Sequence, residues 1–330
     1  MGDKLLRIAL FAGIVLGCLL LGAVATVIAG MAWGMDLNDF MSGMGSSDTG
    51  LLRVMALLNH IFLFLLPPII FAIIYSKREW AEQLAIARAP VWWHVLAGIA
   101  LLFIAYPLVQ KSYEINNLIP LPDWAGQMED STAEVLKQIL NMTSTGDFIF
   151  NAIIIGLLPG IAEELFFRGI IQQESYTWVG RNAWAVWLTA ILFSALHFQF
   201  EGFLPRVVLG ALLGYAFLWT RNLWVPIIMH FVNNVTPVVG MYFFGDDLDS
   251  LDPSTAEPVT WWAFLLSLIA TCGLGYFLYL KTRKDHEPTG IALTADSECP
   301  GIWGVTHRVF VDRHLVLAGT ALFFRGGAVV

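Results

Sequence analysis

The sequence has little charge and little cysteine, and both shortages limit what the protein can be. Only 13% of its 330 residues are charged, whereas 57% are hydrophobic, and the mean hydropathy is +0.69. Soluble globular proteins carry about 25% charged residues, so a water-soluble fold is excluded. The three cysteines, Cys18, Cys272 and Cys299, are widely scattered. This spacing excludes a disulfide framework and a metal site built on thiolates.

Three further features are missing. The sequence contains no HExxH helix, the usual motif of zinc peptidases. It shows no internal repeat, which argues against an inverted-repeat transporter. The first hydrophobic run follows Lys4 and Arg7 but is too long for a signal peptide and lacks a convincing cleavage site. We interpret this run as a retained membrane anchor.

What the chain has instead is a series of hydrophobic runs, each near the roughly 20 residues that a helix needs to cross a bilayer. They predict an all-α, polytopic transmembrane helical bundle of about eight spans in the cell membrane. The predicted spans are Ile8 to Trp33, Leu51 to Tyr75, Val91 to Val109, Phe148 to Gln172, Ala183 to Phe198, Phe203 to Thr220, Leu223 to Phe244 and Trp261 to Leu280.

The connections between these runs alternate in charge. By the positive-inside rule the basic connections face the cytoplasm, and eight spans then place both termini there. The basic residues are Lys4, Arg7, Lys77, Arg78, Arg88, Arg181, Arg221, Lys281, Arg283 and Lys284. The other connections are mostly acidic and would be external. Arg53, Lys111 and Lys137 are exceptions, each outnumbered locally by acidic residues.

The pattern divides the chain into four parts. Residues 1–147 form an N-terminal three-span region with a long external loop, in which Ala133 to Met142 has helical spacing. Residues 148–244 form a core that holds the polar motifs described below, and residues 245–284 contain the last span. Residues 285–330 are interpreted as a dispensable tail outside the membrane, because its one apolar run is too short to span.

The fourth span carries three ionisable residues in the run EELFFRG, namely Glu163, Glu164 and Arg168. A charge at that depth costs on the order of 3 kcal/mol, so it indicates a functional site. Glu164 and Arg168 are four residues apart and share a helix face, which predicts an ion pair that acts as a structural clamp. Glu163 points about 100° away. It is the less neutralised carboxylate and therefore our candidate general base.

Two later spans carry histidines with a partner at helical spacing. Phe193 precedes His197 by four residues, and His230 precedes Asn234 by four. Either pair alone is equally consistent with hydrogen bonds that join membrane helices. His60 and His94 have no polar partner at this spacing, and we interpret them as packing or interface residues.

Together the three motifs resemble the type II CAAX prenyl proteases and bacteriocin-processing enzymes, the CPBP or Abi family of intramembrane proteases. The family signature is EExxxR, FxxxH and HxxxN in three successive regions. These correspond here to Glu163-Glu164-xxx-Arg168, Phe193-xxx-His197 and His230-xxx-Asn234, in the same order. The resemblance covers roughly Phe148 to Phe244.

The resemblance implies an intramembrane endopeptidase in which a glutamate activates water for peptide hydrolysis. By position Glu163 would be that base, His197 would help to hold the water, and His230 with Asn234 would bind a metal or stabilise the oxyanion. A zinc ion held by Glu163, His197 and His230 is possible by ligand type. We favour a metal-free alternative, with imidazole and amide groups on the oxyanion and no obligatory cofactor.

The resemblance implies a substrate that is a membrane-associated or lipid-modified peptide or protein, and no nucleic acid partner is expected. Two other functions remain open. One is a non-catalytic role in bacteriocin immunity or as a scaffold, and the other is an ion-coupled transporter, for which buried Glu and His are also typical.

One feature of the predicted topology does not agree with a shared site. It places His197 near the outer face, but Glu163 and His230 nearer the cytoplasm.

Overall fold

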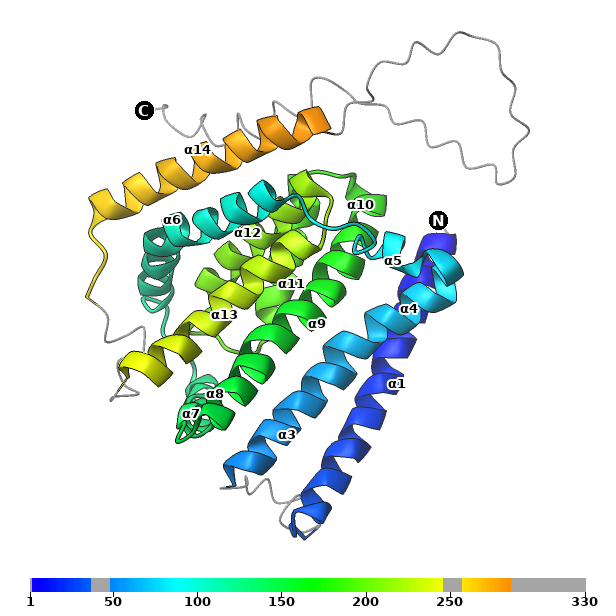
Figure 1. The fold of residues 1–330 in the computed structure, drawn as a ribbon, viewed down its shortest axis with the longest axis vertical. Coiled ribbons are helices and arrows are strands. Elements are labelled where there is room, and N and C mark those ends of the chain that lie inside the picture. The colour runs from blue at the N-terminus through cyan, green and yellow to red at the C-terminus, as the bar shows by residue number, and fades with distance from the viewer. Residues whose placement is uncertain (1, 37–47, 246–256, 286–330) are drawn as a thin grey trace. The chain divides into compact units, whose positions relative to one another are not determined.

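The structure is a computed structural model of the chain and describes residues 2–36, 48–245 and 257–285. All regular secondary structure in these residues is helical (Figure 1), which confirms the predicted all-α class. Residues 1–280 form one compact unit, and the rest of the chain belongs to a second. The predicted tail lies outside the described residues except for Asp285, the last residue of a helix.

In the part of the chain that the structure describes, seven helical elements are long and apolar enough to cross a membrane, which indicates a multi-pass membrane protein. Two of them are composite: α3, η1, α4, η2 and α5 run through Thr49–Gln83, and α8, η3, α9, η4 and α10 run through Thr145–Val179. The others are α1 (Gly2–Ala32), α6 (Trp92–Asn116), α12 (Phe203–Thr220), α13 (Trp224–Phe244) and α14 (Trp261–Asp285).

The fifth predicted span is shorter than expected. Its helix, α11 (Ala183–Ala195), has 13 residues, which at about 1.5 Å per residue measures roughly 20 Å. The hydrocarbon core of a bilayer is about 30 Å thick. The chain turns after Ala195, and Phe198 has a φ of 52°, a left-handed conformation that a bulky side chain rarely adopts. An eighth full-length span is therefore not confirmed, and the predicted location of the termini is not tested.

The long connection after α6 also differs from expectation. The predicted helix from Ala133 to Met142 overlaps a longer helix, α7 (Asp123–Leu140), which begins earlier and ends two residues sooner. This helix begins directly after Pro122, whose fixed φ and missing N–H suit the start of a helix. Only three of its residues are buried, and they are all apolar: Ala125, Ile139 and Leu140. The helix is thus amphipathic and packs along one side.

Prolines change the hydrogen-bond pattern inside two of the long elements. The π-helical segment η1 (Ile61–Leu65) comes just before Pro67 and Pro68, and η3 (Ala152–Leu157) comes just before Pro159. A proline removes one N–H and clashes with the carbonyl four residues earlier. The wider π turn accommodates this loss while the helix continues. A third π segment, η4 (Phe167–Gln172), follows the two glutamates.

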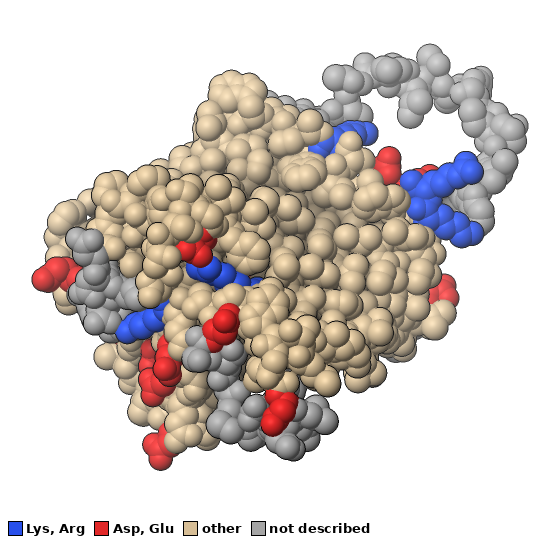
Figure 2. All heavy atoms as spheres, turned by 60° about the horizontal axis from the view of Figure 1, so that its bottom comes forward, with Lys and Arg blue, Asp and Glu red and all other residues tan. Residues whose placement is uncertain are grey.

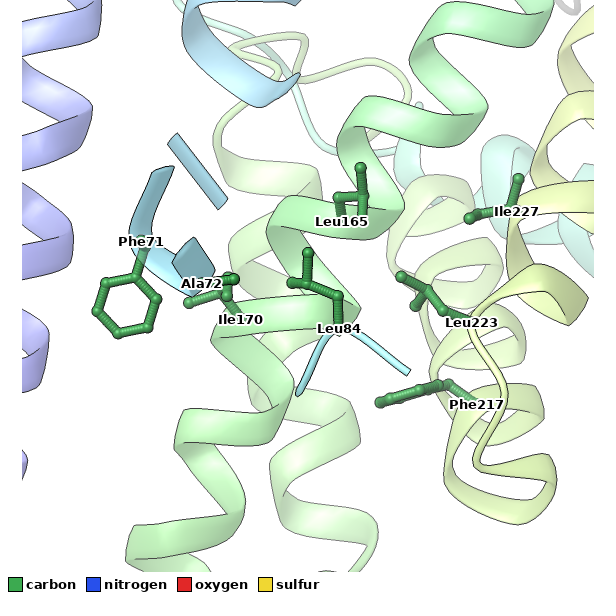
Figure 3. Packing of buried hydrophobic residues seen from close by; sticks show 8 residues of the cluster. All are labelled: Phe71, Ala72, Leu84, Leu165, Ile170, Phe217, Leu223 and Ile227. Atoms are coloured by element: carbon green, nitrogen blue, oxygen red, sulfur yellow. The ribbon is translucent and has the colours of Figure 1, made fainter. Parts of the chain in front are cut away.

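The composite elements pack together through apolar side chains. One buried cluster joins the second span, the EELFFRG element and the α12–α13 corner (Figure 3). Its members are Phe71, Ala72, Leu84, Leu165, Ile170, Phe217, Leu223 and Ile227. Leu165 and Ile170 flank the charged residues on the same element, so the cluster fixes the depth and rotation of that element. The surface in Figure 2 is mostly uncharged, as expected for a protein that contacts lipid.

Candidate active site

Glu163 and Glu164 lie side by side on α9 (Leu158–Phe166), in the interior of the helical unit. Their residues are 4% and 0% exposed. α9 packs against η1 on one side and α13 on the other. A carboxylate in such surroundings must have polar or charged partners, because burial of an unpaired charge is strongly unfavourable. The two glutamates find different partners.

Glu164 pairs with Arg168, as the spacing predicts. The distance from Arg168 Nη1 to Glu164 Oε1 is 2.5 Å, and both side chains are fully buried. Arg168 also donates from Nη2 to the carbonyl oxygen of Gly210 on α12, at 2.8 Å. Its guanidinium lies 5.0 Å from the centre of the Phe193 ring, a cation–π contact. The arginine thus links α9, α11 and α12.

Glu164 also fixes His230 of α13. The Nδ1 atom of His230 donates to Glu164 Oε1 at 2.9 Å, since a carboxylate only accepts. The opposite ring atom, Nε2, is then 3.9 Å from Glu163 Oε2. Glu164 therefore does more than neutralise Arg168. It holds the imidazole of His230 so that its other nitrogen faces Glu163.

His197 reaches the same carboxylate from the turn after α11. Its Nδ1 donates to the carbonyl oxygen of Phe193 at 2.7 Å, and its Nε2 lies 3.7 Å from Glu163 Oε2. The Phe193 ring contacts both imidazoles, with centroids 4.8 Å from His197 and 5.9 Å from His230. The early end of α11 thus accounts for the discordant depth of His197. It brings the histidine to Glu163 within the helical unit.

Polar contacts hold the turn that carries His197. Arg206 of α12 donates to the Gln199 side chain at 2.6 Å and also to its backbone carbonyl. Asn116 of α6 donates to the carbonyl oxygen of Phe200 at 2.8 Å, and Ser194 donates to that of Phe203 at 2.7 Å. A turn held from three helices places the imidazole more precisely than a free loop would.

His60 was missed by the sequence analysis. It ends α3, and its Nε2 lies 3.4 Å from Glu163 Oε1, while its Nδ1 donates to the carbonyl oxygen of Ala56 at 2.9 Å. The interpretation of His60 as a packing residue is therefore wrong. The one signal for it in the sequence was an ionisable side chain within a membrane span, because its partner lies on a distant element.

Asn234 is placed differently from the other predicted residues. Its side-chain amide donates to the carbonyl oxygen of Ile155 at 3.2 Å, and its Oδ1 accepts from the exposed Asn233 at 3.0 Å. Within the described part of the chain, these are the contacts we find for Asn234, and neither involves a glutamate. The geometry groups Glu163, His197 and His230, and leaves Asn234 one turn away.

The carboxylate of Glu163 is thus surrounded by imidazole nitrogens. Each of the three histidines donates from Nδ1 to a carbonyl or carboxylate oxygen, which turns its Nε2 toward Glu163. Glu163 is therefore not the unneutralised group that its spacing from Arg168 suggests. Oε2 has no hydrogen-bond partner among the described residues. At separations of 3.7 and 3.9 Å, Oε2 and the two ring nitrogens can all be contacted by one water molecule that lies beside them.

The metal alternative finds no support in the arrangement of side chains. In the described residues, no group of three or more His, Cys, Asp or Glu side chains is arranged to hold a metal ion. The predicted zinc set of Glu163, His197 and His230 therefore does not fit a metal centre in this structure. We derive no chemical step that requires a metal.

Comparison with known proteins identifies the segment that carries these residues. Residues 145–236 match the family model of Rce1-like type II CAAX prenyl endopeptidases. The chain is also 34% identical over 100 residues to the uncharacterized protein YpbD of Bacillus subtilis (strain 168). That similarity covers 29% of this chain and 46% of the relative, so the two share less than half of the relative's length. No solved structure matches.

The matched segment contains all three sequence motifs and all the ionisable residues of the site except His60. It supports a CAAX-type intramembrane protease kind of function, with hydrolase chemistry. The match of residues 145–236 to the Rce1-like model agrees with the resemblance to the CPBP or Abi family that the three motifs carry.

Proposed function

We propose that the protein is an intramembrane endopeptidase that hydrolyses a peptide bond with water activated by Glu163. The observation that carries this proposal is the position of Glu163 Oε2, which is buried and lies 3.7 and 3.9 Å from Nε2 of His197 and His230. A general base must be within reach of the proton that it removes, directly or through one water molecule. This oxygen and the two nitrogens would orient one water molecule among them.

The proposed reaction uses Glu163 twice. Oε2 accepts a proton from the water while the water oxygen attacks the carbonyl carbon, and His197 accepts the second hydrogen bond of the water. The tetrahedral oxyanion is stabilised by His230, which can donate from Nε2 as well as from Nδ1 only as an imidazolium, and, in our proposal, by Asn234. Protonated Glu163 then gives its proton to the leaving nitrogen as the C–N bond breaks. The atoms balance without a redox partner.

Glu164 and Arg168 have a different part in this proposal. Their ion pair is fully buried, and Glu164 also accepts a hydrogen bond from His230. The pair neutralises two charges that would otherwise destabilise the fold, and it orients His230 toward Glu163. We therefore assign Glu164 and Arg168 to positioning and stability, and Glu163 to the chemistry.

The location of the site supports a proposal for the substrate class. Glu163 and His230 both lie on helices with the length and composition of membrane spans. A peptide bond reaches such a site when its chain is already held at the membrane. We propose a peptide or protein that is membrane-associated or lipid-modified as the substrate, with the lipid bilayer as the second partner.

Hydrolysis can be tested with the purified protein in lipid nanodiscs. The probes are two internally quenched peptides of one sequence, with and without an isoprenyl group on a cysteine near the C-terminus. For unbiased targets, new peptide termini would be compared in membranes of cells that express the wild type or Glu163→Gln. Termini present only with the wild type support the proposal. Identical termini, with both peptides intact, would contradict it and favour a non-catalytic role.

A further inference from the structure

His60 contacts the proposed base from outside the segment that matches the protease family. It belongs to the second span, whereas the family match begins at residue 145. Its Nε2 lies 3.4 Å from Glu163 Oε1, closer than either of the other two imidazoles lies to Glu163. The two oxygens of Glu163 thus face different groups. Oε1 faces His60, and Oε2 faces His197 and His230.

The hydrogen bond at Nδ1 of His60 determines how many protons lie between His60 and Glu163. The carbonyl oxygen of Ala56 only accepts, so Nδ1 of His60 carries a hydrogen. A neutral His60 then presents a lone pair at Nε2 to an oxygen that also has lone pairs. The contact is attractive only when one proton lies between the two atoms. The proton makes either an imidazolium beside a carboxylate or a carboxylic acid beside an imidazole.

The local fold directs His60 toward α9. Its ring lies 6.0 Å from that of Phe64, and Phe64 packs on Phe166 and Phe167 with centroids 5.4 and 6.0 Å apart. The π segment η1 begins at the next residue, and π segments of this kind recur at functional sites. The preceding residue, Asn59, points away from Glu163. It is exposed and lines a pocket of about 270 Å³ with Gly22 and other residues of α1.

We propose that His60 is a positioning residue for hydrolysis: the proton that it shares with Glu163 holds Oε1, so that Oε2 faces the water between His197 and His230. This inference rests on the proposed function. It assigns the N-terminal spans a part in the reaction, because the matched segment alone leaves Oε1 of the base without this partner. His60 would orient the base Glu163, as the third residue of a catalytic triad orients the base beside it.

The kinetic test compares His60→Leu, His60→Gln and Asn59→Leu in the full-length protein, with the peptide that the wild type cleaves. His60→Leu removes the contact. It should lower kcat by about 100-fold, the scale expected for a misplaced reacting group, with KM changed less than about 2-fold because the interaction acts in the transition state. Gln keeps an N–H donor near the position of Nε2 and should restore kcat to within about 5-fold of the wild type. Asn59→Leu should leave both constants unchanged.

A stability measurement tests the contact without any activity. The shifts in Tm of His60→Leu and Glu163→Gln should be non-additive in the double variant, since residues in contact couple. The shifts of Asn59→Leu and Glu163→Gln should add. Additive shifts for His60 would overturn its placement beside Glu163, and normal kcat in a folded His60→Leu would overturn its role. Non-additive shifts in a protein that cleaves no peptide would instead overturn the proposed function and leave the contact standing.

Discussion

At the scale of single residues, the two adjacent glutamates differ in what neutralises them. Glu164 is paired with the permanent charge of Arg168 and with one side of His230. Glu163 is surrounded by the Nε2 atoms of three histidines, whose charge depends on protonation. A carboxylate beside a guanidinium is held as a charged acceptor, whereas one among imidazoles can exchange protons with them. The same substitution should therefore have different results at the two positions.

Glu164→Gln should destabilise the protein. It leaves the buried guanidinium of Arg168 without a counter-charge, and breaking a buried pair costs about 3 to 5 kcal/mol. The measurement is thermal unfolding in detergent together with the yield of folded protein. Arg168→Ala should behave similarly. Glu174→Gln is a control on the same long element. Glu174 pairs with Arg7, whose side chain is 24% exposed, so water can solvate the guanidinium that is left unpaired, and the substitution should cost less than Glu164→Gln.

Glu163→Gln should leave the fold stable and stop the reaction. Gln keeps the shape of the side chain but cannot accept a proton from water at neutral pH, so hydrolysis should fall by about 100-fold or more. Turnover and Tm would be measured on the same preparation. The assignment fails if Glu163→Gln keeps near-normal turnover while a well-folded Glu164→Gln does not. That outcome would place the base on the side of α9 that faces Arg168.

Residue contacts within one helix could be predicted, and contacts between distant elements could not. The Glu164–Arg168 pair and the Phe193–His197 contact both follow from a spacing of four. Nothing in the spacing of His60 links it to Glu163, because their meeting depends on how α3 and η1 pack against α9. Asn234 has the right spacing to His230, yet its amide is engaged by Ile155.

At the scale of elements, the site depends on how closely α13 approaches the EELFFRG element. A β-carbon on Gly160 would lie 3.1 Å from the backbone nitrogen of Phe231 and 3.3 Å from the carbonyl oxygen of Ile227. Small residues allow membrane helices to approach in this way. Gly160 is one turn before Glu164, and Phe231 follows His230. The close approach therefore sets the distance between His230 and both glutamates.

Gly160→Ala should damage both stability and activity. The added methyl group presses on backbone atoms that cannot move without shifting α13, and overpacking of this kind costs about 1 to 3 kcal/mol. Gly240 lies on α13 and has nothing within 4 Å of an added β-carbon. Gly240→Ala should therefore be neutral or stabilising by up to about 1 kcal/mol, as for most helical glycines.

The comparison is made by Tm and by turnover on the same peptide. A fall in turnover for Gly160→Ala, beyond what its unfolded fraction accounts for, would show that the approach of α13 positions His230. Equal behaviour of the two alanine variants would contradict this role of Gly160.

Most long elements were predictable because hydrophobic runs and the need for backbone hydrogen bonds in lipid leave helices as the simple solution. Their local irregularities were not. The predicted fifth span, Ala183 to Phe198, has apolar residues throughout, but the helix ends at Ala195 where His197 turns toward Glu163. The π segments beside Pro67 and Pro159 keep those helices continuous. Composition alone does not distinguish a kink from such a segment.

At the scale of the whole molecule, the charge pattern has physical explanations even where it departs from the positive-inside rule. Arg53 lies in an otherwise acidic region, and it forms an ion pair with Asp147 and donates to the carbonyl oxygen of Ile139 at 3.1 Å. Lys111 pairs with Glu114 and donates to the carbonyl oxygen of Val259 at 2.8 Å. A basic residue held by local partners is a poor guide to orientation, so these exceptions leave the predicted topology intact.

The number of crossings depends on α11 and the turn after it. Arg181 before α11 and Arg221 after α12 are basic and exposed, which predicts the cytoplasmic side for both. Glu201, in the turn between these helices, contacts the acidic helix α7: its backbone N–H donates to Oε1 of Glu129 at 3.1 Å. If α7 is external, Glu201 is external too. The short helix and its turn together then complete a crossing.

Cysteine labelling tests this topology in a background in which the three native cysteines are replaced by serine. Glu201→Cys should react with an impermeant maleimide added outside intact cells, whereas Arg181→Cys and Arg221→Cys should react only after permeabilisation. An even number of crossings would follow, with both termini in the cytoplasm. If Glu201→Cys instead labels only together with the two arginine positions, α11 and α12 form a re-entrant pair. That result would refute the eight-span prediction. Two crossings would be lost together, so the number would stay even and both termini would still lie on the same side, and the substrate would have to reach Glu163 in a bundle with fewer crossings than the charge pattern predicts.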